Sequence, residues 1–273
     1  MQQNRLTKTI VLGLIAAGIS MSAQAHDAWL LPNTAMVDAK EAWVTLDAGI
    51  SNQLFEFNHA PLRLDNLTIT DPDGVATRAE GAVLGKYRST LDLRLPKDGT
   101  YRLSIVNNNV MGSYKLGNET KRFRGAQGSP AVQVPAGATE VQSTNVISRL
   151  ETFVSANKMN DTALKPSGTG LEMIPVTHPS DLRVGEPIRV RFQLDGQPAA
   201  NLPFSVVGGT AKYRNAAGEQ RVTTDAKGEA SFTVTAPNMY YVSASVPHGE
   251  RKGPPQAGAK RYTYAATFEV LPQ

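Results

Sequence analysis

Residues 98–105 read Asp98-Gly99-Thr100-Tyr101-Arg102-Leu103-Ser104-Ile105. After the turn-forming Asp-Gly pair, polar and apolar side chains alternate, which is the pattern of a β-strand with one buried face. Residues 96–99 have turn composition, and residues 87–95 form a second alternating segment before them. The sequence therefore predicts two strands, at 87–95 and 100–106, joined by a short turn.

Tyr101 gives this stretch a more specific pattern, because it follows Gly99 by two residues and precedes Leu103 by two. The pattern resembles the Gly-x-Tyr-x-Leu segment of immunoglobulin-like sandwiches, in which the tyrosine hydroxyl folds back onto a nearby backbone group. We expect Tyr101 to make such a corner. The alternative is an ordinary strand that contains one aromatic residue.

The same alternation recurs along the chain, whereas helical periodicity is nearly absent after residue 25. Examples are residues 43–48, 64–70 and 147–156, and Gly, Pro, Asn and Asp separate such segments. A further exposed hairpin is expected at 114–123, with its turn at Gly117-Asn118. Short strands with frequent turn residues indicate an all-β sandwich architecture.

Residues 1–25 have the three parts of a secretory signal peptide. Arg5 and Lys8 precede an apolar stretch at residues 10–17, and Ala23-Gln24-Ala25 is a small-residue cleavage signal. The apolar stretch at residues 10–17 is too short to span a bilayer, and no other stretch of the sequence is long and apolar enough to do so. We expect a periplasmic protein that does not span the membrane once processed.

The remaining chain divides into two predicted domains. Residues 26–160 form an N-terminal immunoglobulin-like sandwich, and residues 157–170 have the Gly, Pro and Ser content of a linker. Residues 171–273 resemble the transthyretin-like sandwich modules of exported proteins, with an Asp-Gly turn in 194–206. The fold prediction is thus two β-sandwich domains after a cleaved signal peptide.

Composition excludes several classes of function. The net charge of +4 includes Arg5 and Lys8, so the chain from residue 26 carries +2, which argues against nucleic acid or anionic membrane as partner. There is no cysteine, hence no disulfide and no cysteine nucleophile. No Gly-x-Ser-x-Gly elbow or spaced Ser/His/Asp set occurs either. We expect a protein that is not an enzyme.

Cleavage after Ala25 would make His26 the first residue of the mature protein. Its free α-amine and its Nδ1 could then close a chelate ring on one metal ion. His59 is the first candidate for a further ligand, and Asp27 could supply an oxygen or orient the imidazole. Nitrogen and oxygen ligands without thiolates suit Ni²⁺, Co²⁺, Cu²⁺ or Zn²⁺. The third mature residue is Ala28, which excludes an amino-terminal chelate that needs a histidine there.

Other distinctive residues have simpler expected roles. His178, at a predicted strand end, is a surface residue unless domain packing brings it to the site. His248 lies in the polar tract 247–258 and is expected to be exposed. Trp29 and Trp43 flank the first strand, and both are expected in the core because of their large apolar area.

The block His26-Asp27-Ala28-Trp29-Leu30-Leu31-Pro32 resembles the mature start of DUF4198 proteins, an exported family commonly linked to nickel or cobalt uptake. Further likeness lies in residues 57–61, 71–74, 99–101, 175–179 and 185–186. The resemblance implies a periplasmic, β-rich protein that binds a divalent transition metal, nickel or cobalt, beside an outer-membrane receptor or metal-uptake transporter.

Two alternatives remain open. In the first, both sandwiches form a scaffold or interaction module at an outer-membrane transporter and bind no metal. In the second, the His26 chelate holds a copper redox centre that acts on a polymer, as in oxidases with a terminal-histidine brace. Metal titration of the processed protein separates the metal-binding function from the scaffold function.

Overall fold

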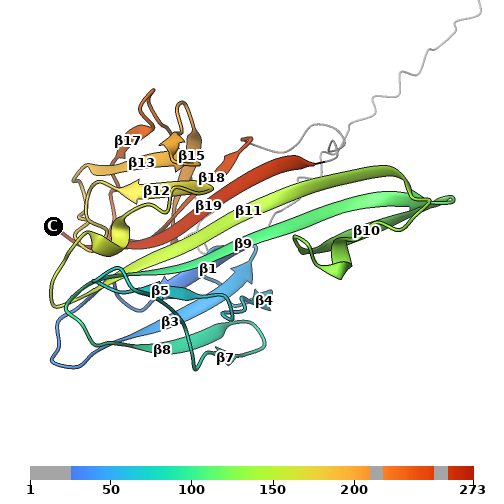
Figure 1. Ribbon diagram of the computed structural model, residues 1–273. Helices are drawn as coiled ribbons and strands as arrows, with labels where there is room; N and C mark the ends of the chain where they lie inside the picture. The colour runs from blue at the N-terminus through green and yellow to red at the C-terminus, as the bar shows by residue number, and fades with distance from the viewer. Residues whose placement is uncertain (1–25, 210–217, 249–257) are drawn as a thin grey trace, which may run out of the picture.

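The computed structural model describes residues 26–209, 218–248 and 258–273, and in these ranges the chain is built almost entirely of strands (Figure 1). The all-β prediction is confirmed. The predicted signal peptide, residues 1–25, and most of the polar tract 247–258 lie outside the described residues. No helix in the described part is long and apolar enough to cross a membrane.

The N-terminal outer sheet is antiparallel and carries the start of the described chain. Its strand order is β1 (Asp27–Pro32), β3 (Ala42–Ser51), β8 (Ser89–Leu95) and β7 (Val83–Leu84), and β4 (Ala60–Pro61) pairs with the end of β3. In β3 every second side chain from Ala42 to Ala48 is buried. This alternation sets one face of the sheet against the core.

The central sheet has ten strands and contains residues from both halves of the chain. Its order is β16 (Gln220–Thr223), β15 (Pro203–Gly208), β18 (Asn238–Val246), β19 (Ala259–Val270), β11 (Thr139–Ala156), β9 (Gly99–Leu116), β5 (Thr68–Thr70) and β6 (Ala76–Arg78); β10 (Glu119–Ala126) pairs with β9 and β2 (Met36–Val37) with β11. The halves join where β11 and β19 run parallel. They therefore share one continuous hydrogen-bonded sheet.

The C-terminal outer sheet has four strands. They are β12 (Leu171–Pro175), β13 (Ile188–Leu194), β14 (Gln197–Pro198) and β17 (Glu229–Phe232). Residues 157–170, which have linker composition, connect β11 to β12 and include the 3₁₀ turn η2 (Thr162–Leu164), whose Ala163 and Leu164 are buried. A second 3₁₀ turn, η1 (Pro130–Val132), follows β10.

Two hydrophobic clusters lie on opposite faces of the central sheet. Tyr241 belongs to the cluster under the N-terminal outer sheet, whereas its neighbours Tyr240 and Val242 belong to the cluster under the C-terminal outer sheet. Successive residues of a strand point to opposite faces. The molecule is therefore a three-layer arrangement, in which one sheet serves as a wall of both sandwiches.

The tyrosine corner is confirmed. The Tyr101 hydroxyl donates to the carbonyl oxygen of Lys97 at 2.9 Å, and the Lys97 backbone N–H donates to that hydroxyl oxygen at 2.8 Å. A second corner, which the sequence analysis missed, occurs in the other half: the Tyr240 hydroxyl donates to the Ala236 carbonyl at 2.8 Å. Each tyrosine binds the residue four positions earlier and closes the turn into its strand.

The prediction for the tryptophans is right for Trp29 and wrong for Trp43. Trp29 is fully buried, but the Trp43 side chain is 51% exposed. Trp43 lies on β3 between buried Ala42 and Val44, so the strand alternation turns it to the outer face. Its size alone was a poor guide to its burial.

The strands β9, β10 and β11 extend beyond the outer sheets as an arm, residues 107–143 (Figure 1). The predicted hairpin is confirmed, since Leu116 pairs with Glu119 across Gly117-Asn118. Gly117 has φ +59°, which a glycine adopts without the penalty of a Cβ. The arm exposes the side chains of Met111, Leu116 and Val141.

Candidate functional site

The two predicted histidine ligands meet. The ring centroids of His26 and His59 lie 3.8 Å apart, with 28° between the ring planes. His26 precedes β1, and His59 precedes β4. Both strands border the end of β3, because Ile50 pairs with Ala28 on β1 and with Ala60 on β4. The sheet thus places residues 33 positions apart beside each other.

Trp29 holds the segment that carries His59. Its ring centroid lies 5.7 Å from that of Phe55 and 5.5 Å from that of Phe57, and its Nε1 donates to the Ser51 hydroxyl at 2.9 Å. Edge-on aromatic contacts of this kind add to the free energy gained by burial. The buried indole therefore fixes the approach of residues 55–59 to the start of β1.

Asp27 is partly buried beside Tyr241. Burial raises the pKa of the Asp27 carboxyl, and the neighbouring His26 charge opposes that rise. Burial, together with the Asp27 charge, also holds the pKa of the Tyr241 hydroxyl well above its usual range. That hydroxyl donates to the Ala28 carbonyl at 3.1 Å, while the Asp27 carboxylate accepts no hydrogen bond from the described residues. Such a carboxylate favours a cation that would replace its lost hydration.

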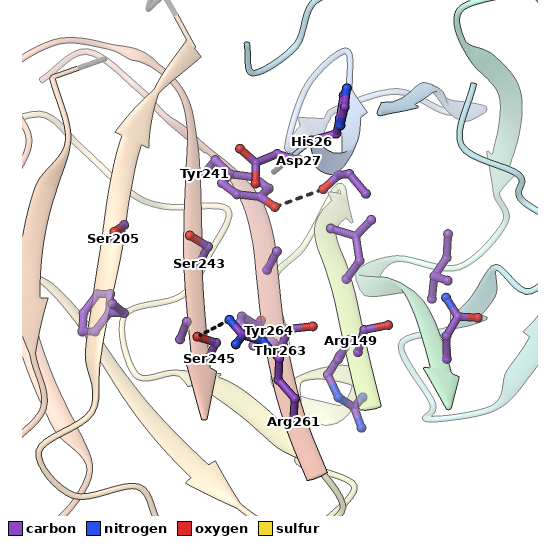
Figure 2. Close-up of a pocket in the computed structure, with 18 of the residues that line it drawn as sticks. His26, Asp27, Arg149, Ser205, Tyr241, Ser243, Ser245, Arg261, Thr263 and Tyr264 are labelled. Atoms are coloured by element: carbon purple, nitrogen blue, oxygen red, sulfur yellow. Dashed lines mark hydrogen bonds between the residues drawn. The ribbon is translucent and has the colours of Figure 1, made fainter. Parts of the chain in front are cut away.

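His26 and Asp27 form one end of a cavity of about 470 Å³ (Figure 2). Its floor is the face of the central sheet that the N-terminal outer sheet leaves uncovered. Hydroxyl side chains are the common feature of this floor: Ser148, Ser205, Ser243, Ser245 and Thr263. On β18, Ser243 and Ser245 flank Ala244, which belongs to the cluster on the opposite face. The alternation therefore directs these hydroxyls into the cavity.

Arg261 lies at the other end of the cavity from Asp27 (Figure 2). Its guanidinium donates to the Ser245 hydroxyl at 3.3 Å. This hydroxyl-lined face was not predicted from the sequence. Its signal is small polar residues on the same strand face, Ser243 and Ser245 on β18 and Thr263 on β19, a pattern that resembles a solvated strand.

The described residues contain no group of three or more His, Cys, Asp and Glu side chains arranged to hold a metal ion. Among the predicted ligands, the side chains of His26 and His59 are in contact, and Asp27 is adjacent to His26 in the sequence. The third nitrogen of the predicted chelate is the backbone nitrogen of His26. It is an amide while residue 25 is attached, and it becomes an amine only on cleavage.

The other two histidines lie in different places. His178 is partly buried, and its Nε2 lies 3.0 Å from the Thr100 hydroxyl, beside a chain of hydroxyls that continues through Ser155 to Ser180. It does not line the cavity, so the possibility that it joins the His26 site is not realised. His248 is exposed, as expected, and it lines the cavity.

Beneath the cavity floor, a buried ionic network ties three strands together. The Arg149 guanidinium lies 3.2 Å from both the Glu151 and the Glu172 carboxylates, and the Tyr264 hydroxyl donates to Glu151 at 2.9 Å. These residues come from β11, β12 and β19. Because every charge here has a partner of opposite sign, the network stiffens the floor and leaves no charge for a ligand.

The comparisons with known proteins add one family and a few distant structures. Residues 23–248 match a family described as "Domain of unknown function (DUF4198)". A comparison with curated proteins gives no match. Among solved structures, the D0-D1 domain of Intimin is 12% identical at a TM-score of 0.21, and the similarity covers 88% of this chain and 96% of that one.

Two other solved structures are similarly distant. Escherichia coli alpha-2-macroglobulin activated by porcine elastase is 12% identical at a TM-score of 0.24, with 91% of this chain and 20% of that chain covered. The ICAM-5 D1-D4 ectodomain fragment is 12% identical at a TM-score of 0.20, with 90% and 51% covered. The functional inference therefore stays with the residues of this chain.

Proposed function

The chain belongs to the DUF4198 family, and from that premise we propose that it is a periplasmic binding protein for a divalent transition metal, nickel or cobalt, accessory to metal uptake. The observation that carries the proposal is the contact between the His26 and His59 rings at 3.8 Å. Cleavage at residue 25 would add the His26 amine to these two imidazoles. One amine and two imidazole nitrogens are a ligand set that Ni²⁺, Co²⁺ and Cu²⁺ favour.

Asp27 supports the same proposal through its charge. Its partly buried carboxylate has lost part of its hydration, and it accepts no hydrogen bond within the described chain. A divalent cation beside it would stabilise the ionised form. Asp27 then acts either as an oxygen ligand or as the group that orients the His26 imidazole.

Calorimetric titration of the processed protein with Ni²⁺, Co²⁺ and Cu²⁺ tests the proposal. The protein with a free His26 amine is compared with a version that keeps one extra Met before His26. We expect the extra residue to weaken binding at least about tenfold, because it removes one chelating nitrogen. Equal affinity in both versions would take the amine out of the site, and absence of binding in the processed form would refute the function.

His59 is tested beside a matched histidine. His59→Ala is expected to weaken metal binding at least about tenfold, whereas His178→Ala leaves it unchanged because His178 lies in another network. Copper is expected to bind more tightly than nickel or cobalt to such a site. The physiological metal is therefore identified by metal content after expression in the periplasm, where N-terminal sequencing should also begin at His26.

A second function, an interaction module at an outer-membrane transporter, is favoured by the arm. The arm exposes apolar side chains, and Arg122 and Arg124 on β10 are exposed with no ion pair among the described residues. A photo-cross-linking residue at Val141, compared with one at exposed Val75, tests this function. Cross-links to an outer-membrane transport protein from position 141 alone support it, and equal labelling from both positions contradicts it.

A further inference from the structure

The cavity beside Asp27 has opposite charges at its two ends. Asp27 is at one end, Arg261 is at the other, and the hydroxyl-bearing floor lies between them (Figure 2). A carboxylate favours a cation, whereas a guanidinium and hydroxyl donors favour carboxylate oxygens. The cavity is therefore suited to a ligand that is positive at one end and negative at the other.

Several floor hydroxyls make no hydrogen bond to another described residue. Ser148, Ser243 and Thr263 make no side-chain hydrogen bond among the described residues, although all three line the cavity. Ser245 in contrast accepts from Arg261, and its hydroxyl lies 3.3 Å from the Pro247 carbonyl oxygen. Three hydroxyls on one sheet face can thus bind a ligand without breaking an internal hydrogen bond.

The size of the cavity exceeds the needs of a single ion. Its volume of about 470 Å³ falls in the range of small-molecule sites, roughly 300–1,000 Å³. The protein in turn offers few metal ligands, since no group of three or more His, Cys, Asp and Glu side chains is present in the described ranges. A metal bound at the histidines would keep coordination positions that a small molecule in the cavity could fill.

We propose that the cavity binds the metal as a complex with a small hydroxycarboxylate, with the metal and the oxygens that chelate it at the His26 end and a further carboxylate directed along the serine and threonine floor toward Arg261. The inference rests on the proposed function, and it names the form in which the metal arrives. Asp27 disfavours a carboxylate that is not neutralised by the metal at its own end. This charge fixes the direction in which the complex lies.

The test compares three probes on the processed protein: Ni²⁺ alone, citrate alone, and the one-to-one Ni²⁺–citrate complex. Calorimetry gives the affinities, and mass spectrometry under native conditions gives the composition of what is bound. We expect a ternary complex of protein, nickel and citrate, bound at least about tenfold more tightly than citrate alone. If citrate only withdraws nickel from the protein and no ternary complex forms, the inference is wrong.

Variants of the floor separate this inference from the proposed function. Arg261→Gln and Ser243→Ala with Thr263→Val are expected to weaken binding of the Ni²⁺–citrate complex about tenfold and to leave the affinity for Ni²⁺ alone within about twofold. The matched controls are Arg189→Gln and Ser231→Ala, which are exposed on the other outer sheet. Equal loss for both probes would refute the chelate, and no Ni²⁺ binding at all would refute the proposed function itself.

Discussion

Asp27 makes the metal-free protein less stable than it would otherwise be. Burial raises the pKa of its carboxyl in the folded protein, so the folded state holds the proton more strongly than the unfolded state does. The contribution of Asp27 to the free energy of unfolding is then highest below the ordinary pKa of 3.8 and falls as the pH rises through the folded-state value. At neutral pH the Asp27 carboxyl is ionised, and burial of this charge lowers the free energy of unfolding.

Asp27→Asn removes the free-energy cost of burying the ionised carboxylate. We expect the variant to be more stable than the native protein at pH 7 in the absence of metal. The difference should shrink as the pH falls through the raised pKa of the Asp27 carboxyl and be gone below about 4. Urea unfolding at several pH values measures it, with Asp161→Asn as an exposed control. The same variant should bind metal more weakly. A stability difference independent of pH would contradict the role of the carboxyl.

The two tryptophans provide a matched pair of substitutions. Trp29→Ala is expected to lower the free energy of unfolding by about 3–5 kcal/mol, because it removes a fully buried side chain. Trp43→Ala should cost about 1 kcal/mol or less, since the side chain is 51% exposed. Chemical denaturation followed by circular dichroism measures both. Similar losses for the two would contradict the outward orientation of Trp43.

The sequence singles out His26, Asp27 and His59 as candidate metal ligands. The contact between the His26 and His59 rings could not be derived from it. His59 reaches His26 because β1 and β4 flank the end of β3, and that pairing involves segments far apart in the chain. The prediction that Trp43 is buried was wrong because hydrophobic size predicts burial only on average. The apolar neighbours Ala42 and Val44, which alternate with Trp43 along the strand, indicate that Trp43 points outward.

Two strands of the central sheet begin at tyrosine corners, β9 at Tyr101 and β18 at Tyr240. Tyr101→Phe removes one bond to the Lys97 carbonyl and one from the Lys97 N–H, so we expect a loss of about 1–3 kcal/mol. Tyr240→Phe loses the bond to Ala236 and should cost about 1 kcal/mol. Tyr87→Phe, at an exposed position, is the control. Thermal unfolding checks the order of the three variants.

Local turn chemistry explains why single elements were predictable. Asp195 and Gly196 both have positive φ, 50° and 77°, as a two-residue hairpin requires, and Leu194 pairs with Gln197 across them. Gly117-Asn118 was identified on the same grounds. The second corner was missed because Tyr240 follows no Asp-Gly turn, so its pattern differs from that of Tyr101.

The shared central sheet makes the whole molecule one unit of stability. The clusters on its two faces are separated only by the sheet, and the parallel pairing of β11 with β19 joins the halves. The buried Arg149, Glu151 and Glu172 link β12 to the same region. Loss of packing in one half is therefore transmitted to the other.

Phe192→Ala tests this coupling from the side opposite to Trp29. In a Trp43→Phe background, Trp29 is the only tryptophan, and its fluorescence reports the N-terminal half. Removing the fully buried Phe192 should lower the free energy of unfolding by about 3–5 kcal/mol and shift the Trp29 transition by the same amount. An unchanged Trp29 midpoint would show that the two halves unfold independently.

The arrangement of the halves could not be predicted from the sequence. Alternation and turn residues report local structure, whereas the pairing of β11 with β19 joins positions far apart in the sequence, such as Glu151 and Ala266. Nothing in the periodicity of either strand names its partner. The sequence thus predicts strands and their exposed faces well, and the sharing of one sheet not at all.

The late position of β19 also determines when the protein can fold. β11 is 18 residues long, and its partner on one side is β19, which lies far along the sequence at Ala259–Val270. While the chain is being synthesised, that side of β11 remains an open strand edge until residues near 270 have emerged. Folding of the central layer therefore waits for residues 259–270, and a nascent chain needs protection from aggregation until they have emerged.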